Sequence, residues 1–350
     1  MPSDPTSADI PASPPDGADT RAIEAKVRLL REPAAYDRAP ASVLVTETHM
    51  SWVFLAGDLV YKLKKPVRFP FLDFTTLAAR EANCREEVRL NRRLAPQTYL
   101  GTVPLTEDDA GALALDGRGT VVDWLVVMRR LPADRMFDRM LQEDRIGATE
   151  TDQIANLLAR FYRASDHPIV DPAAYVDRLM AQQAENRAIL TSRAFAVDHA
   201  RLPTILDRLD QRMAEDRPLI EEPARAGRIV EGHGDLRPEH ICLTDPIVVF
   251  DCLEFSPELR LVDPFDELAF LGLECRILGA PSIGPTLVER VADQLGDHPP
   301  PRLVAFYTAF RAVLRARLSL AHLLDTAPRE PAKWEPLASR YLTVAEESLR

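Results

Sequence analysis

The stretch "HGDLRPEHICLTDPIVVFDCLEF", residues 233–255, places two histidines and several acids around a short apolar run. His233, Asp235 and His240 precede the apolar residues 247–250, and Asp251 follows them. A short β-branched run between polar residues is typical of a buried strand. A polar loop before such a strand and a carboxylate after it fit three interpretations: a surface turn beside a core strand, a hydrolytic metal site, or a site for phosphoryl transfer.

The composition predicts a two-part chain with a sizeable core. Its 350 residues exceed one small domain, and 46% of them are hydrophobic. The net charge of −11 argues against nucleic acid as a partner, because a phosphate backbone needs a basic face. Four cysteines without a CxxC pair predict buried free thiols in a reducing compartment. No apolar run reaches the roughly 18 residues of a membrane span, and no signal pattern opens the chain. We therefore expect a cytoplasmic protein with no membrane partner.

Segment patterns divide the chain into three parts. Residues 1–20 are rich in Pro, Ser, Ala and Asp, which predicts a disordered tail. Residues 21–131 predict a short helix over 21–32, then strands, one further helix over about 76–95, and more strands. Residues 132–350 are dominated by helical periodicity. The strands of the middle part are expected at 42–48, 51–56, 59–64, 112–115 and 120–128, and the helices of the last part at 149–163, 172–191, 202–217, 302–325 and 332–348.

Lysine is used sparingly and in one place. Only five of the 43 basic residues are lysine, and three of them, Lys62, Lys64 and Lys65, lie within four positions. A chain that otherwise uses arginine therefore keeps lysine at the end of one predicted strand. A solvated strand end is one explanation for the cluster, and a binding role is the other.

These motifs resemble the aminoglycoside phosphotransferase and choline kinase group of small-molecule kinases. The resemblance rests on HGDLxxxHIxL with the following strand and Asp251, and on "ETHMSWVFLAGDLVYKLKKPV", residues 47–67. It is closest to a bacterial branch that is sometimes fused to a P-loop domain; no GxxxxGK[ST] motif occurs here. The resemblance covers nearly everything from Val43 onward. It implies an α+β, two-lobed protein-kinase-like fold, with a small antiparallel-sheet N-lobe carrying one helix and a larger, mostly helical C-lobe.

The resemblance assigns chemistry to the opening stretch. Asp235 matches the acid that receives or orients the acceptor hydroxyl in phosphoryl transfer. The catalytic-loop spacing D-x-x-x-x-N brings His240 to the position of a metal-binding Asn. Because Mg²⁺ prefers oxygen ligands, His240 is either a metal ligand or an orienting group. Asp251 matches the metal-binding Asp after the strand, and Glu254 is either a second acidic ligand or a surface residue.

The lysine cluster matches the phosphate-binding lysine of the family. Period-two alternation puts Val60, Lys62 and Lys64 on one strand face. Val60, two residues before Lys62, suits the position under an adenine ring, so Lys62 is the favoured phosphate lysine and Lys64 the alternative. Glu87 shares the inward helical face with Cys84 and Leu90, whereas Glu86 is turned toward solvent. We therefore expect an ion pair between Lys62 and Glu87.

Other family positions are assigned with fewer matching residues. The glycine-rich phosphate loop is missing, and "TETHMS", residues 46–51, offers the hydroxyls of Thr48 and Ser51 instead. Backbone groups of Arg129 to Leu131 form the expected hinge that reads the adenine edge.

Three further residues match positions that support the catalytic loop. Asp266 is expected to cap a helix and brace the catalytic loop. His233 is expected to brace the loop as well, and Asp263 to point toward the acceptor or to form another cap.

The resulting hypothesis is an ATP- and Mg²⁺-dependent kinase that acts on a small hydroxylated molecule. It requires the side chains of Lys62, Asp235 and Asp251 to converge. A nucleotide-binding module with little or no transferase activity is the alternative that His240 and the missing glycines suggest. A zinc hydrolase built on His233, Asp235 and His240 is a third hypothesis, and it would leave the lysine cluster without a purpose.

Overall fold

The computed structural model describes residues 17–69, 72–192, 195, 197–324 and 330–350. The chain forms two compact units, the first comprising Met1–Ala133 with Val248–Ser256 and the second Asp134–Ile247 with Pro257–Arg350. The first boundary lies two residues after the predicted one, and residues 248–256, expected in the helical lobe, belong to the first unit. Residues 1–16 of the expected tail lie outside the described residues, whereas 17–20 belong to a helix.

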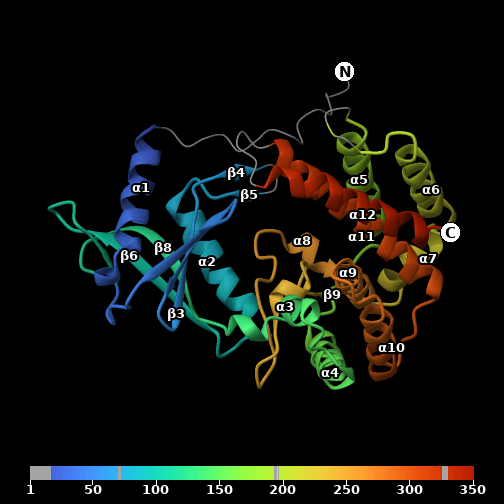
Figure 1. The fold of residues 1–350 in the computed structure, drawn as a ribbon, viewed down its shortest axis with the longest axis horizontal. Coiled ribbons are helices and arrows are strands. Elements are labelled where there is room, and N and C mark those ends of the chain that lie inside the picture. The colour runs from blue at the N-terminus through green and yellow to red at the C-terminus, as the bar shows by residue number, and fades with distance from the viewer. Residues whose placement is uncertain (1–16, 70–71, 193–194, 196, 325–329) are drawn as a thin grey trace. The chain divides into compact units, whose positions relative to one another are not determined.

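The first unit is built on a six-stranded antiparallel sheet with the strand order β1-β2-β3-β8-β6-β7 (Figure 1). Its strands are β1 (Val43–Glu47), β2 (Ser51–Ala56), β3 (Leu59–Lys64), β6 (Tyr99–Glu107), β7 (Leu113–Leu115) and β8 (Thr120–Arg129). A small hairpin, β4 (Arg68–Phe69) and β5 (Leu72–Asp73), follows β3. Five of these six sheet strands were expected from the sequence.

Strand β6 is the one that the sequence analysis missed, and it lies between β8 and β7. Gly101 and Pro104 interrupt its apolar pattern, and both residue types normally argue against a strand interior. The structure accommodates them at an irregular part of the ladder: the register shifts between Tyr99 and Gly101, and Pro104 lies opposite Trp124. The expected five strands are thus corrected to six.

Each face of the sheet is covered by one helix. Helix α1 (Gly17–Arg31) packs Ile23 and Leu30 onto Phe54, Leu63 and Leu125 of the sheet. Helix α2 (Leu77–Asn91) covers the opposite face and begins at Thr76, whose hydroxyl accepts the Ala79 amide. Because side chains alternate along a strand, the residues next to Leu63 point to the α2 face. That alternation presents Lys62 and Lys64 to α2.

The second unit is mostly helical. Its helices are α3 (Phe137–Gln142), α4 (Ala148–Ala164), α5 (Pro172–Leu190), α6 (Leu202–Glu215), α7 (Arg217–Arg225), α8 (Pro257–Arg260), α9 (Pro264–Ile277), α10 (Ile283–Leu295), α11 (Pro301–Ala321) and α12 (Pro331–Ser348). The five helices expected here are confirmed with shifts of a few residues at their ends. Sequence periodicity did not identify α7 and α10.

Helix α9 is the centre of the second unit. Twelve of its fourteen residues are buried, as expected for a helix that neighbours surround on all sides. Two short strands, β9 (Val230–Glu231) and β12 (Leu261–Val262), pair with each other. The polar loop at 233–240 follows β9, and helix α9 follows β12. This pairing fixes the loop beside the first turn of α9. The stretch that follows the loop contains β10 (Ile241–Cys242) and, in the first unit, β11 (Val248–Val249).

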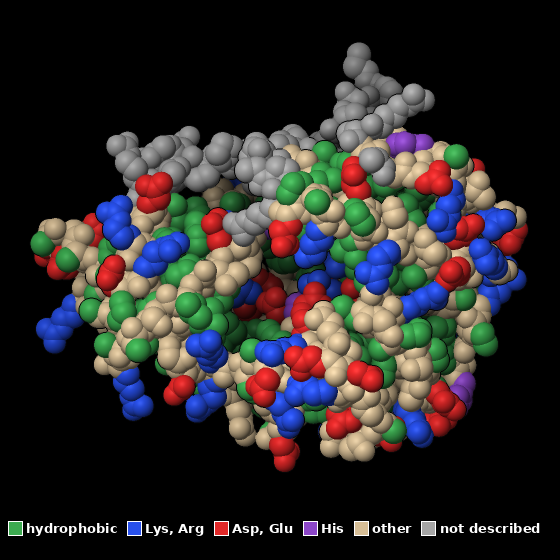
Figure 2. Space-filling model, viewed as in Figure 1, with side chains coloured by type: hydrophobic (Ala, Val, Ile, Leu, Met, Phe, Trp, Pro, Cys, Tyr) green, Lys and Arg blue, Asp and Glu red, His purple; other side chains and the backbone are tan. Residues whose placement is uncertain are grey.

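The surface shows mixed charge. On the face drawn in Figure 2, acidic and basic side chains are interspersed. Many form pairs along one helix, such as Arg225 with Glu221 at 2.8 Å. Within the part of the chain that the structure describes, no helix combines the length and the apolar character needed to cross a membrane.

Asp123 is the buried charge that joins both helices of the first unit to the sheet. It is fully buried in β8, and its carboxylate contacts Lys26 of α1 at 2.8 Å and Arg80 of α2 at 2.8 Å. Asp123→Ala leaves both cations without their partner, so we expect it to lower the free energy of unfolding by about 3–5 kcal/mol in urea denaturation. The matched control Glu86→Ala removes an exposed pair with Arg89 and should cost under about 1 kcal/mol. Equal losses in the two variants would contradict this assignment.

Candidate active site

Lys62, Lys64 and Glu87 form a buried charge cluster between β3 and α2. The Lys62 ammonium lies 2.9 Å from Glu87 Oε1, and the Lys64 ammonium lies 2.5 Å from Glu87 Oε2. Glu87 is fully buried, while Glu86 points outward to Arg89, as the helical periodicity predicted. The expected ion pair between Lys62 and Glu87 is present. Lys64 was the alternative partner of Glu87. The Glu87 carboxylate binds both ammonium groups, one through each oxygen.

Asp251 and Glu254 add two carboxylates to this cluster. Asp251 Oδ1 lies 2.8 Å from the Lys62 ammonium, and Glu254 Oε1 lies 2.7 Å from the Lys64 ammonium. The Asp251 side chain is 41% exposed, whereas the Glu254 side chain is 10% exposed. Two roles were left open for Glu254, a second acidic ligand or a surface residue. Its low exposure excludes the surface position, and metal ligation by Glu254 stays a prediction. Its carboxylate is the partner of a buried lysine.

The backbone around Asp251 is held by two buried side chains that the sequence analysis missed. Asp251 has a φ of 58°, in the left-handed region that non-glycine residues seldom adopt. Its N–H donates to the Tyr99 hydroxyl at 3.2 Å, and the Cys252 N–H donates to Asn91 Oδ1 at 2.9 Å. Asn91 in turn donates to the Glu87 carbonyl at 2.8 Å. The spacing of Asn91, four residues after Glu87 on the same helical face, was the available signal.

Mutual charge keeps the cluster ionised. Burial alone lowers the pKa of Lys62, but Asp251 and Glu87 raise it well above its usual range. Burial likewise disfavours the charged form of Lys64, and Glu254 and Glu87 raise its pKa. Burial raises the pKa of the Glu87 carboxyl, and the two lysines lower it below its ordinary value. Lys62, Lys64 and Glu87 are therefore all charged at neutral pH.

Asp235 lies in the polar loop of the second unit and carries its own cation. Arg237 contacts Asp235 Oδ2 at 3.0 Å, and its other amino group contacts Glu239 Oε1 at 2.5 Å. Burial raises the pKa of the Asp235 carboxyl, but the Arg237 guanidinium lowers it below the usual value. Asp235 is therefore a carboxylate at neutral pH, and Arg237 is a neighbour that the sequence analysis did not single out.

His240 is held by both ring nitrogens. Nδ1 lies 2.8 Å from the Asp235 carbonyl oxygen, which can only accept, so Nδ1 carries the proton. Nε2 lies 3.3 Å from an Arg237 amino group, which can only donate, so Nε2 is the acceptor. Through these two contacts the imidazole orients the loop. Metal ligation by His240 stays a prediction, and it would require the Arg237 contact to be lost.

The start of α9 braces this loop through a different residue from the one expected. Glu267 accepts the Gly234 N–H through Oε1, and Tyr162 donates to its Oε2 at 3.2 Å. Asp266, expected to be the cap and brace, instead forms two bonds of 2.7 and 2.6 Å with Arg311. The helix cap is Asp263, which accepts the Phe265 N–H at 3.0 Å. The prediction identified the correct turn of α9. It assigned the contact with the catalytic loop to Asp266, whereas the neighbouring Glu267 makes it.

His233 supports the same loop: its Nδ1 accepts the Asp235 N–H at 3.3 Å. The bracing role expected for His233 is thus consistent with its contact.

The predicted phosphate loop is a tight turn between β1 and β2. The Thr48 hydroxyl donates to the Ser51 carbonyl at 3.1 Å and accepts the Ser51 N–H at 2.9 Å. Ser51 itself is buried. Both residues therefore serve the turn, and their contact with a phosphate stays a prediction.

The predicted hinge follows β8. The Arg129 N–H donates to the Thr98 carbonyl and the Arg130 N–H to the Asp58 carbonyl, each at 2.8 Å. The Leu131 N–H makes no backbone hydrogen bond with the described residues. Val60 lies on the α2 face of β3, opposite Met128. Of the three hinge residues, Leu131 therefore has the backbone donor that a ligand could use.

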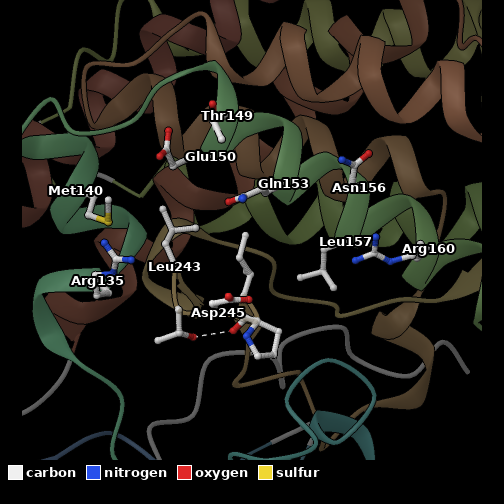
Figure 3. Close-up of a pocket in the computed structure, with 13 residues that line it drawn as sticks. Arg135, Met140, Thr149, Glu150, Gln153, Asn156, Leu157, Arg160, Leu243 and Asp245 are labelled. Atoms are coloured by element: carbon white, nitrogen blue, oxygen red, sulfur yellow. Dashed lines mark hydrogen bonds between the residues drawn. The ribbon is translucent and has the colours of Figure 1, made fainter.

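A separate cavity of about 500 Å³ lies within the second unit (Figure 3). It is formed by one face of α4 and the turn after β10, with Arg135 and Arg160 at opposite ends of the drawn view. None of the residues assigned to catalysis lines it. It is therefore distinct from the loop that carries Asp235.

Within the described residues, no group of three or more His, Cys, Asp or Glu side chains is arranged to hold a metal ion. A magnesium ion in a nucleotide site needs only one or two protein carboxylates, because phosphate and water oxygens complete its coordination. The exposed Asp251 carboxylate suits that arrangement.

Sequence comparison finds similar proteins in mycobacteria. No family model matches the chain. Uncharacterized proteins from Mycobacterium bovis and Mycobacterium tuberculosis are 34% identical over 309 residues, which cover 87% of this chain and 59% of each relative. The chain thus spans about three fifths of the length of the curated relatives that it matches.

Two solved kinase structures share the architecture. A choline/ethanolamine kinase family protein from Mesorhizobium loti matches with a TM-score of 0.56 at 15% identity, over 94% of this chain and 95% of that one. The choline kinase of Cryptosporidium parvum matches with a TM-score of 0.53 at 11% identity, with the same coverage. This chain therefore has the α+β fold of the choline kinase group, which confirms at the level of the fold the resemblance carried by the HGD motif.

Asp263 makes a pH-dependent contribution to stability. Burial raises the pKa of its carboxyl to about 7, whereas an unfolded Asp titrates near 3.9. The folded state binds the extra proton between these values, so the contribution is complete below about pH 4 and is lost as the pH rises through about 7.

Asp263→Asn keeps a neutral cap for Phe265 and removes this titration. We expect the stability difference between wild type and variant to shift toward the variant by about 4 kcal/mol from pH 4 to pH 8. Urea unfolding of both proteins across this range measures the shift. A difference that is constant with pH would contradict the assignment.

Proposed function

We propose that this chain is an ATP- and Mg²⁺-dependent kinase that transfers the γ-phosphate to a hydroxyl group of a small molecule. The observation that carries the proposal is the contact of one ammonium, that of Lys62, with both buried Glu87 and exposed Asp251. A buried strand lysine paired with a helix carboxylate and set beside an exposed acid provides a cation for phosphates and an oxygen ligand for a metal.

Lys62 is assigned to the phosphates of the nucleotide. The Lys62 side chain is 14% exposed, whereas the Lys64 side chain is 1% exposed and its ammonium contacts two carboxylates. A ligand phosphate can therefore reach Lys62 and take the place of the Asp251 carboxylate. Glu87 remains as the partner that keeps the ammonium in position.

Asp251 is assigned to the metal. Its carboxylate is exposed, and the bonds from its own N–H and that of Cys252 fix its backbone. When bound, Mg²⁺ supplies charge neutralisation on the phosphate oxygens. The nucleotide base is assigned to Val60 and to the backbone near Leu131, with Arg129 as an additional predicted contact. Thr48 and Ser51 are predicted contacts of the phosphates.

Asp235 is assigned to the acceptor hydroxyl. As a carboxylate it accepts a hydrogen bond from that hydroxyl and orients the oxygen toward the γ-phosphorus. It takes the hydroxyl proton as the new O–P bond forms and the bond from the γ-phosphorus to the β,γ-bridging oxygen breaks, with ADP as the leaving group. Arg237, His240 and Glu267 hold the loop so that the Asp235 side chain keeps one orientation. The acceptor is a small hydroxylated molecule, and the proposed setting is the cytoplasm, without nucleic acid or membrane as partner.

A nucleotide-binding module with little or no transferase activity is the second candidate. Two observations favour it: the Thr48–Ser51 turn uses its own hydroxyl and amides internally, and both His240 nitrogens are engaged within the loop. Such a module would bind the nucleotide through Lys62 without turning it over.

The test is an ATP-consumption assay with Mg²⁺ over aminoglycosides, amino sugars, choline-like alcohols and free sugars. On the best acceptor, Asp235→Asn should lower kcat by about 10²–10⁴-fold, the usual contribution of a positioned acid–base group. The control Asp293→Asn changes an exposed acid of α10 and should leave kcat within about twofold.

Three outcomes separate the candidates. Turnover that depends on Asp235 supports the kinase. Thermal stabilisation by MgATP without turnover on any acceptor supports the binding module. Turnover that Asp235→Asn retains, or a wild type that neither binds nor consumes ATP, would contradict the proposed mechanism.

A further inference from the structure

Lys64 and Glu254 form a second ion pair beside the one that the proposed function uses. The Lys64 ammonium is enclosed by Glu87 Oε2 at 2.5 Å, Glu254 Oε1 at 2.7 Å and the ring of Phe74, whose centroid lies 5.4 Å away. Lys64 is 1% exposed, so a ligand has little access to it. A lysine buried this deeply does not meet a phosphate, and its role has to be exerted through its neighbours.

The balance of charge in the cluster indicates how Lys64 acts on its neighbours. Three carboxylates, on Glu87, Asp251 and Glu254, share two ammonium groups. Lys64 contacts Glu87 and Glu254, and Lys62 contacts Glu87 and Asp251. An uncompensated buried carboxylate is costly, and it attracts whichever cation is nearest. Without Lys64, both Glu87 and Glu254 lose an ammonium partner, and Lys62 is the neighbouring lysine in the cluster.

Glu254 also tethers the segment that carries Asp251. Along this segment the Asp251 N–H binds Tyr99, the Cys252 N–H binds Asn91, and the Glu254 side chain binds Lys64. The first two bonds are neutral, and the third joins opposite charges out of water, which is the stronger kind. None of these three bonds involves Lys62.

We propose that Lys64 and Glu254 are positioning residues of the nucleotide site. Lys64 neutralises Glu87 and Glu254 permanently, which leaves Lys62 free to move from Asp251 to the phosphates of a nucleoside triphosphate. Glu254 anchors the metal-binding segment to β3 through Lys64. The two neighbouring lysines thus have separate tasks, one fixed and one responsive to the ligand. This inference rests on the proposed function.

The test measures the Kd of a non-hydrolysable ATP analogue with Mg²⁺ by calorimetry, which needs no acceptor. Lys64→Met should weaken binding by about tenfold, because Lys62 is then drawn to Glu254. Lys64→Arg keeps the charge and should bind within about threefold of wild type. Lys65→Met is the matched control: its ammonium contacts Glu47 at 2.5 Å and lies 4.7 Å from the centroid of the Trp52 ring, and the variant should bind like wild type.

The double variant Lys64→Met with Glu254→Gln separates positioning from folding. It removes the competing carboxylate together with its cation, so Lys62 again serves only Glu87 and Asp251. Binding should return to within about threefold of wild type, although the pair is lost. This variant is balanced in charge, so it also carries the test if Lys64→Met alone fails to fold. A purely structural role of Lys64 predicts no such recovery of affinity.

The inference is overturned if Lys64→Met binds the analogue as tightly as Lys65→Met, or if the folded double variant stays about tenfold weaker than wild type. Either result, with normal binding by the wild type, leaves the proposed function in place. A wild type that does not bind the analogue contradicts the proposed function, and this inference with it.

Discussion

The first unit depends on one constraint: the Glu87 carboxylate is fully buried and must be balanced by charge. Removing a carboxylate from water costs several kcal/mol unless cations and hydrogen bonds compensate it. Lys62 and Lys64 both provide that compensation, and each brings a further carboxylate with it, Asp251 and Glu254. One buried acid on α2 thus brings β3 and the segment after β11 together.

In the helical unit, the charge and the orientation of Asp235 are also maintained by its neighbours. A carboxylate that is to meet a substrate has to stay charged and keep its direction. Arg237 maintains the charge, while His233, His240 and Glu267 bind the backbone of the loop. The orientation of the side chain is therefore set by the loop around it, and the bonds that set it come from the loop itself and from the first turn of α9.

Much of this was predictable because it follows from local periodicity. Alternation along β3 placed Lys62 and Lys64 on one face, and helical spacing turned Glu87 inward. The spacing in the HGD stretch placed Asp235 in a loop and Asp251 after a short strand. These features need only the geometry of a single element, which the sequence specifies directly.

The rest depends on partners that are distant in sequence. Helical spacing turns Asn91 to the same face as Glu87, but it does not identify the partner. The tethers from Tyr99 and Asn91 to the segment at 251–252 join residues more than 150 positions apart. Strand β6 was missed because Gly101 and Pro104 suit a strand only where the ladder is irregular. The brace at α9 was assigned to Asp266 rather than Glu267 because two adjacent acids face different neighbours, and only the fold distinguishes them.

The most direct measurement is a crystal structure of the protein with Mg²⁺ and a non-hydrolysable ATP analogue. The account predicts that the Lys62 ammonium contacts a phosphate oxygen and has left Asp251, that Asp251 is a ligand of the metal, and that the Lys64–Glu254 pair is unchanged. A nucleotide bound elsewhere, with the contact between Lys62 and Asp251 intact, would contradict it.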